Sequence, residues 1–182
     1  GVTAYEPSEL YCSALAGTPL SDLEALLAQH QQRLAFEPPR FGRGTVGGMV
    51  AAGLSGPSRA ALGSVRDHLL GVTLLSGSGE LMHFGGRVIK NVAGYDVSRL
   101  VAGSLGILGV IVEVSLKVLA RAQDEKTLRF DCKPAEALTM LHGWGARPLP
   151  LDASAWWNGS LIVRLRGASA AVAEAAHLLG GE

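Results

Sequence analysis

The sequence has little cysteine and no surplus of either charge. Its two cysteines, Cys12 and Cys132, lie far apart, and its five histidines show no metal-like spacing. A zinc or iron–sulfur site needs several Cys or His ligands at short spacing, so we expect no metal site and two reduced thiols. The 16 Lys and Arg residues balance the 16 Asp and Glu residues, which argues against a nucleic-acid-binding surface or a polybasic membrane patch.

Long hydrophobic runs and targeting signals are also missing. The longest uncharged apolar stretch, residues 100–112, ends at Glu113 and is shorter than the ~20 residues that a transmembrane helix needs. No charged-then-apolar signal segment opens the chain, so a cytoplasmic protein is expected. The chain begins with Gly1 rather than Met, which favours a piece of a longer protein.

Glycine, in contrast, is abundant and unevenly placed. The chain has 24 glycines, well above the average share of ~7%, and most of them fall between Gly42 and Gly109. Glycine costs backbone entropy on folding, so a globular protein concentrates it where the backbone must lie against another backbone or a ligand. The segment from Gly42 to Gly109 is therefore where we expect the functional site.

The hydrophobic pattern indicates both helices and strands. Ser21 and Glu24 have the S-x-x-E spacing of a capping box and predict the start of a helix that ends before Pro38. Residues 110–118 alternate between apolar and polar and predict a half-buried strand. We also expect strands at 10–15, 70–74 and 80–84, a helical turn at 46–52, and a short helix that Asp96 caps and that reaches Val101.

The last third of the chain predicts a β-α-β-β-α order. Strands are expected at 128–132, 155–158 and 161–165, and helices from Pro134 and over 168–179. This is the order of a split βαβ, or ferredoxin-like, module that lacks its last strand.

Residues Gly42–Gly47 match G-x-G-x-x-G, the dinucleotide-binding fingerprint. A Rossmann turn needs a hydrophobic strand directly before it. Pro38 and Pro39 cannot belong to a central strand, because proline has no donor for the ladder. The NAD-type Rossmann interpretation is therefore disfavoured.

Two backbone-exposing segments leave alternatives open. Thr45–Gly53 is either a tight turn into a helix N-terminus whose free N–H groups bind phosphate oxygens, or a glycine-lined packing site between two elements. Gly103–Gly109 is either a loop that presses main chain against a flat ring system, or a compact crossover between a helix and a strand.

Four motifs follow one another in an order that is typical of one family. They are Thr45–Gly48, Gly53–Arg59, Lys90–Asp96 and Gly103–Glu113. Together they make the chain resemble the FAD-binding domain of the vanillyl-alcohol oxidase and p-cresol methylhydroxylase (PCMH) superfamily. Within that superfamily the chain is most similar to the FAD-binding E subunits of bacterial glycolate oxidases, and residues 37–39, 63–67 and 90–100 carry this similarity.

The resemblance implies an α+β fold in two parts. Residues 1–122 would form the second lobe of a PCMH-type FAD-binding domain, an antiparallel sheet flanked by helices. Residues 123–182 would form a partial ferredoxin-like cap or substrate-type module. The first lobe with its phosphate-binding loop is missing, so the chain is expected to be truncated at the N-terminus, and at the C-terminus as well.

The cofactor that the resemblance implies is FAD. Covalent attachment in this superfamily uses a His or Cys, and because neither lies between Gly42 and Arg59, non-covalent FAD is expected. Whether a chain without the first lobe retains FAD is left open. The residues expected to contact FAD are Thr45, Val46, Gly47, Gly48 and Met49, then Gly53, Gly56 and Arg59, and finally Gly106, Gly109, Val110 and Ile111.

The implied function is that of an FAD-binding subunit in a glycolate (2-hydroxy acid) oxidase or dehydrogenase complex, which oxidises glycolate to glyoxylate. Its expected partners are a homologous flavoprotein subunit and an iron–sulfur subunit that receives the electrons. The complex would be cytoplasmic, or peripheral to the inner membrane through its partner subunits. The candidates for a substrate-binding cation or base are Arg59, Arg66, His83 and Lys90, but the catalytic residues stay unassigned.

Two other functions remain open at this point. One is a non-catalytic FAD-fold subunit that serves assembly or electron relay, with the substrate site on a homologous subunit. The other is a glycine-rich structural domain without flavin.

Overall fold

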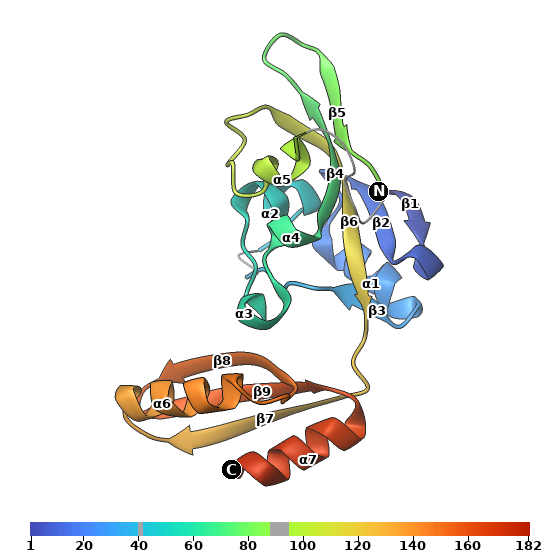
Figure 1. Ribbon diagram of the computed structural model, residues 1–182. Helices are drawn as coiled ribbons and strands as arrows, with labels where there is room; N and C mark the ends of the chain where they lie inside the picture. Colours follow the sequence, from blue (N-terminus) through green and yellow to red (C-terminus); the bar gives the residue numbers. More distant parts are fainter. Residues whose placement is uncertain (40–41, 88–94) are drawn as a thin grey trace. The chain divides into compact units, whose positions relative to one another are not determined.

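The computed structural model describes residues 1–39, 42–87 and 95–182. The chain divides into two compact units, one formed by Gly1–Gly56 and Gly63–Arg121, the other by Pro57–Leu62 and Ala122–Glu182. Figure 1 labels the elements of both units. Within the described residues, no helix has the length and the apolar character that crossing a membrane requires.

The first unit is built on an antiparallel sheet with strand order β1-β2-β6-β4-β5. Its central strand, β6, pairs with β2 on one side and β4 on the other, and β3 pairs with its end. This confirms the strands predicted at 110–118, 70–74 and 80–84, and the last two pair with each other as a hairpin. The strands are β1 (Val2–Glu6), β2 (Tyr11–Leu15), β3 (Gln32–Leu34), β4 (Leu69–Leu75), β5 (Leu81–Gly85) and β6 (Val110–Ala120).

The core of the first unit lies on one face of this sheet. Alternate residues of β6, Val114, Leu116 and Val118, are buried there because a strand turns successive side chains to opposite faces. Two helices contribute Leu23, Leu27, Val46 and Val50 to the same cluster. The helices of this unit are α1 (Leu20–Gln29), α2 (Val46–Ala52), α4 (Val65–His68) and α5 (Val97–Val101), with a 3-10 turn at Pro7–Glu9.

The predicted capping box at Ser21 is wrong. Helix α1 already begins at Leu20, whose amide donates to the carbonyl of Gly44 at 3.0 Å, so Ser21 lies inside the first turn. The Ser21 hydroxyl donates to Asp22 Oδ1 at 3.1 Å instead. The helix also ends at Gln29, short of Pro38, because the next residues form β3 against β6.

The cap predicted at Asp96 is confirmed. Its carboxylate accepts a hydrogen bond from the amide of Arg99 at 3.2 Å, at the start of α5. Ser98 donates to the same carboxylate at 2.8 Å. These bonds set where the helix before the second glycine-rich segment begins.

The second unit is a three-stranded antiparallel sheet with order β7-β9-β8 and two helices. Its core combines Leu161, Val163 and Leu165 of β9 with Val172 and Ala175 of a helix. The β-α-β-β-α order predicted for this part is confirmed, while the roles predicted for 1–122 and 123–182 stay predictions. The elements are β7 (Asp124–Asp131), α6 (Pro134–Gly145), β8 (Leu151–Trp157), β9 (Ser160–Gly167) and α7 (Ser169–Leu179).

The short segment Pro57–Leu62 joins the second unit through a buried polar cluster. It contains α3 (Arg59–Leu62) and the fully buried Ser58, whose hydroxyl donates to Asp152 Oδ2 at 3.1 Å. Arg164 donates to Asp152 at 2.6 Å and to the Ser58 hydroxyl at 2.7 Å. Arg166 lies 3.3 Å from the same carboxylate, so two guanidinium groups balance one buried aspartate.

Candidate functional site

The two glycine-rich segments that the sequence singled out meet in the structure. The amide of Gly103 donates to the carbonyl of Val50 at 3.0 Å, and the amide of Leu105 donates to Ala51 at 2.9 Å. Gly53, which ends α2 in the left-handed region at φ 65°, lies close against Gly103, because a Cβ there would be 3.0 Å from Gly103 Cα. The end of α2 and the loop after α5 therefore form one continuous stretch of surface.

The start of α2 does not offer free amides. Thr45 caps the helix, and its hydroxyl accepts from the amide of Gly48 at 3.2 Å. The amide of Val46 donates to Thr18 at 2.9 Å, and that of Gly47 donates to Ala16 at 2.8 Å. Of the two alternatives left open for Thr45–Gly53, these bonds favour the glycine-lined packing site over free N–H groups that bind phosphate oxygens.

The predicted glycines fall into two groups. A Cβ added to Gly47 would lie 2.4 Å from Ala16 Cβ, and one on Gly56 would lie 2.0 Å from the Glu37 carbonyl oxygen. A Cβ on Gly109 would lie 2.8 Å from the Leu75 carbonyl oxygen. These three glycines serve packing within the protein. Gly103 and Gly106, in contrast, have no atom within 4 Å of an added Cβ, and Gly48 is exposed.

The loop from Gly103 to Gly109 is flanked by exposed apolar side chains. Leu105 is 75% exposed, Ile107 is 85% exposed, and Val110 at the start of β6 is 63% exposed. Large exposed apolar side chains gathered in one short segment favour a site that binds a ligand or a partner. Together with the open backbone of Gly103 and Gly106, it can lie against a flat apolar ring. We call Gly103–Val110 the apolar loop.

The other predicted contact residues lie partly in the core. The side chains of Val46 and Met49 are buried, and Ile111 packs against the core from β6. Only the main chain of Val46 and Met49 is therefore left for a ligand, whereas the Ile111 side chain is half-buried. Arg59 is exposed on α3, in the second unit, whereas the remaining predicted contacts belong to the first unit.

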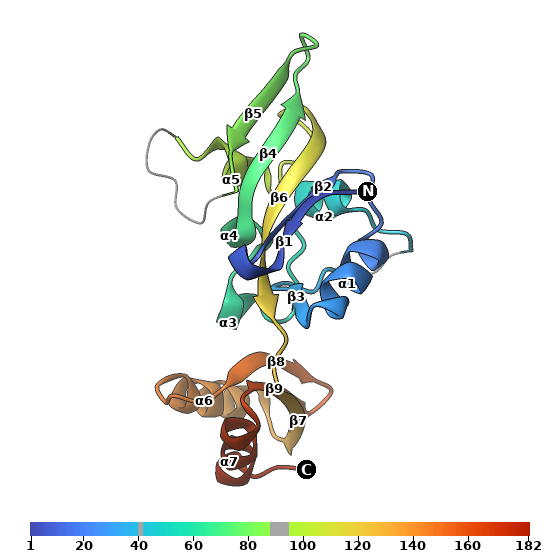
Figure 2. The same cartoon turned by 90° about the vertical axis from the view of Figure 1, so that its right-hand side faces the viewer.

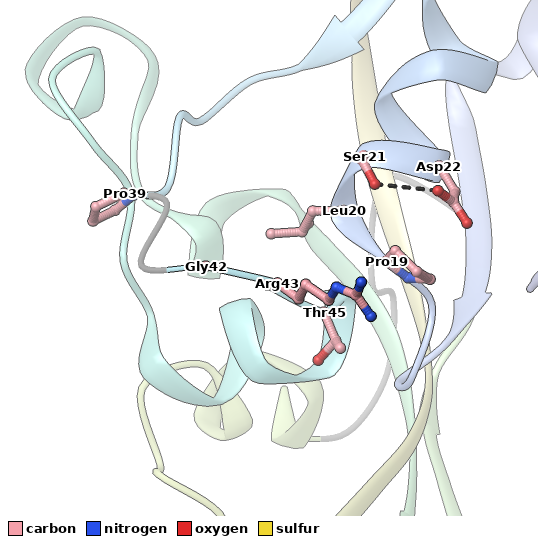
Figure 3. Close-up of a pocket in the computed structure, with 9 residues that line it drawn as sticks. Pro19, Leu20, Ser21, Asp22, Pro39, Gly42, Arg43 and Thr45 are labelled. Atoms are coloured by element: carbon pink, nitrogen blue, oxygen red, sulfur yellow. Dashed lines mark hydrogen bonds between the residues drawn. The ribbon is translucent and has the colours of Figure 1, made fainter.

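A pocket of about 420 Å³ lies at the other end of α2, between the residues before Thr45 and the start of α1. Figure 3 shows Arg43 reaching toward the first turn of α1, beside Thr45, with the Ser21–Asp22 hydrogen bond on the far wall. The guanidinium of Arg43 is a donor for a phosphate or a carboxylate. Four residues of the Gly42–Gly47 pattern, Gly42, Arg43, Gly44 and Thr45, line this pocket. The pattern was considered only as a Rossmann turn, which did not predict a pocket here.

The candidate catalytic residues are dispersed. The ring of His83 on β5 lies with Nδ1 2.9 Å from Thr73 Oγ1, and Arg66 is exposed on α4. Lys90 lies outside the described residues. Both cysteines are free, and burial raises the pKa of the Cys12 thiol to about 12. In the described parts of the chain, no three His, Cys, Asp or Glu side chains gather as metal ligands.

Residues 1–85 match the FAD binding domain family. This part of the chain is an FAD-binding domain. The match covers the first two of the four motifs, and it confirms the prediction of FAD as the cofactor.

The relatives that the chain matches include two glycolate oxidase subunits and a D-lactate dehydrogenase. The chain is 46% identical to glycolate oxidase subunit GlcE of Escherichia coli over 183 residues, which cover all of this chain and 52% of that protein. It is 33% identical to glycolate oxidase subunit GlcD of Bacillus subtilis over 92 residues, 50% of this chain and 20% of that protein. It is 32% identical to a D-lactate dehydrogenase of Archaeoglobus fulgidus over 62% of this chain and 25% of that protein.

The chain thus spans about half the length of GlcE, a relative that matches its whole length. Among solved structures, alkyldihydroxyacetonephosphate synthase superposes with a TM-score of 0.77 at 19% identity, over 98% of this chain and 39% of that one. At that identity the likeness shows the fold alone. It confirms the α+β class expected for a PCMH-type FAD-binding domain.

The described residues fit one part of FAD better than another. The apolar loop, with the open backbone of Gly103 and Gly106, suits a ring system. The amides at the start of α2 do not suit the pyrophosphate, because they bond within the protein. Arg43, beside Thr45, is a cation within reach of the pocket at that end of the helix.

Proposed function

We propose that this chain belongs to the FAD-binding subunit of a glycolate (2-hydroxy acid) oxidase or dehydrogenase complex. The observation that carries the proposal is the 46% identity to GlcE over the whole chain, through both units rather than the FAD-binding domain alone. The contact between the end of α2 and the apolar loop supports it, because these are the two segments in which the sequence places cofactor contacts.

In this proposal the chain binds and orients FAD. FAD would accept the two electrons that are released when glycolate is oxidised to glyoxylate. The apolar loop would cover a ring of the cofactor, and Gly48 and Thr45 would lie beside it at the start of α2. Arg43 would neutralise an anionic group of the bound molecule. The other predicted contacts, Val46, Gly47, Met49, Gly53, Gly56, Arg59, Gly109 and Ile111, would act through their main chain or by shaping this surface.

The proposed partners are a homologous flavoprotein subunit and an iron–sulfur subunit that receives the electrons. Two relatives of the chain, GlcE and GlcD, are both glycolate oxidase subunits by name, which supports a complex of several subunits. The proposed location is the cytoplasm, or the inner membrane surface through those partners. The FAD would be held without a covalent bond, because residues 42–59 contain no His or Cys.

A second candidate is an FAD-fold subunit that relays electrons or supports assembly without oxidising the substrate itself. The observation that favours it is the dispersal of the candidate catalytic residues. Within the first unit, His83 on β5 is bonded to Thr73, and Arg66 is exposed on α4. No hydrogen bond joins these two described side chains, whereas a substrate cation and a base would lie together.

The test is an absorbance scan of the full-length protein that contains this chain, purified without partners and titrated with glycolate. Flavin bands that bleach on addition of glycolate would support the catalytic subunit. Flavin bands that stay unchanged until the partner flavoprotein is added would support the second candidate. A full-length protein without flavin bands, even after incubation with FAD, would overturn both.

A further inference from the structure

The face of the first sheet that lies opposite the core carries a row of polar side chains across three strands. Strands β5, β4 and β6 lie side by side in that order (Figure 2). Thr73 on β4 stands directly opposite His83 on one side and Glu113 on the other. Because directly paired residues point to the same face, these three side chains form one row. The hydrogen bond of 2.9 Å between Thr73 Oγ1 and His83 Nδ1 agrees with this arrangement.

The next row on the same face is nearly free of side chains. Gly71 stands opposite Gly85 on β5 and Ser115 on β6. The chain that leaves β5 crosses above Gly71, where a Cβ would lie 2.6 Å from the carbonyl oxygen of Gly86. A pair of glycines inside a sheet marks a place where another backbone or a ligand approaches closely.

The crossing chain brings a cation over the sheet. The guanidinium carbon of Arg87 lies 5.9 Å from the ring centroid of Tyr11 on β2, a cation–π contact. Arg87 therefore reaches over the sheet beyond Ser115, on the far side of the glycine row from Thr73 and His83. Among the described residues, no carboxylate pairs with it.

These groups enclose a pocket of about 220 Å³, small beside the ~300–1,000 Å³ of sites for larger ligands. Thr73, His83 and Glu113 line one side, Arg87 and the Gly85–Gly86 backbone line the other, and Ser115 lies between. Glu113 accepts from Thr3 at 2.7 Å and the Ser115 and Ser13 hydroxyls lie 2.7 Å apart, so both side chains are held in place.

We propose that this pocket binds a small hydroxycarboxylate, separately from FAD. The carboxylate of the ligand pairs with the Arg87 guanidinium, which presents donors in a planar fork. The hydroxyl of the ligand donates to Glu113 or exchanges a hydrogen bond with His83 Nε2, the ring nitrogen that Thr73 leaves free. A cation at one end and acceptors at the other select a molecule that carries both groups within a few bonds of each other.

The test is isothermal titration of glycolate into the full-length protein freed of flavin, so that the outcome does not depend on the proposed oxidase function. We expect saturable binding that weakens at least tenfold in Arg87→Gln. Acetate, which lacks the hydroxyl, and glycolamide, which lacks the charge, should each bind more weakly than glycolate. Arg147→Gln is the matched control, because Arg147 is an exposed arginine of the second unit, and it should bind glycolate like the wild type.

Two results would overturn the proposal. One is the absence of saturable glycolate binding to the flavin-free wild type, and the other is equal affinity in Arg87→Gln and the wild type. Thermal melting of each variant shows whether it is folded, and Glu113→Gln, which keeps the shape of the side chain, gives an independent second measurement at the other end of the pocket. A negative result in this titration would not predict the outcome of the flavin-bleaching experiment, so the two proposals can be overturned independently.

Discussion

The amide of Gly103 donates a 3.0 Å hydrogen bond to the carbonyl oxygen of Val50, and this bond ties the loop after α5 to the last turn of α2. The two residues are far apart in the sequence. Their contact depends on Gly53, which turns the chain out of α2 and leaves no side chain in the way. The apolar loop is thereby held against a rigid element, although its own apolar side chains are exposed.

The exposed isoleucine of the apolar loop provides a test of ligand binding that is separable from stability. Because the Ile107 side chain is 85% exposed, Ile107→Lys should change the free energy of unfolding by no more than ~0.5 kcal/mol. We expect it to weaken FAD binding to the full-length protein at least tenfold, because a charge would lie against an apolar ring. Flavin fluorescence titration measures this, with Leu138→Lys on the exposed side of α6 as the control. Equal FAD affinity in the two variants would contradict the placement of FAD at this loop.

Two neighbouring glycines of α2 should respond differently to alanine. Gly47→Ala places a methyl 2.4 Å from Ala16 Cβ, and overpacking of this kind costs ~1–3 kcal/mol. Gly48→Ala meets only the Thr45 hydroxyl, at 3.1 Å, and Gly48 is exposed. Its methyl gains helix propensity of up to ~1 kcal/mol, so its stability should stay near that of the wild type. Urea unfolding of both variants compares them, and equal losses would argue against the packing role of Gly47.

The buried aspartate of the second unit should be far more sensitive than an exposed one. Asp152→Ala leaves Arg164 and Arg166 without their shared carboxylate, and removing one partner of a buried ion pair costs ~3–5 kcal/mol. Asp131→Ala removes the carboxylate partner of Arg129 in an exposed pair, where the expected loss is at most ~1 kcal/mol. Chemical denaturation of the two variants tests the difference. Similar losses would mean that the cluster around Ser58 does not hold Pro57–Leu62 in the second unit.

The capping aspartate of α4 predicts a pH dependence. The pKa of Asp67 is lowered, chiefly by the hydrogen bond from the Ser64 amide and then by the one from the Ser64 hydroxyl. A carboxyl with a depressed folded-state pKa stabilises the protein above its unfolded-state pKa and loses this contribution as pH falls through the folded-state value. Asp67→Asn should therefore cost roughly 0.5–2 kcal/mol at neutral pH, and the difference from the wild type should shrink in acid, below the usual pKa of an aspartate. Urea unfolding at a series of pH values measures it, and a constant difference would rule out the titration of Asp67 as its cause.

Several elements could be predicted from the sequence because their signals are local. The alternation in 110–118 is enough to specify β6, and Asp96 is a good enough acceptor to specify the start of α5. The four ordered motifs identified the FAD-binding family and its cofactor. The capping box at Ser21 failed because α1 starts two residues earlier, at Leu20, where the Leu20 amide bonds to the carbonyl of Gly44, a residue distant in the sequence. The predicted helix also extended past Leu34, and this failed for a similar reason. Leu34 belongs to a strand because it pairs with Val118, and that long-range contact has no local signal.

The roles of individual glycines needed the tertiary structure. The sequence showed where the glycines are concentrated and which family has glycine-rich motifs in this order. It gave no way to distinguish the role of Gly47 from that of Gly48. A helix turns neighbouring residues to different faces, and only the fold sets Ala16 against one of those faces. In the same way, local pattern determined the strands that carry Thr73, His83 and Glu113. Their alignment in one row beneath Arg87 was decided by strand register and by the path of the chain after β5, and no local signal encodes these long-range contacts.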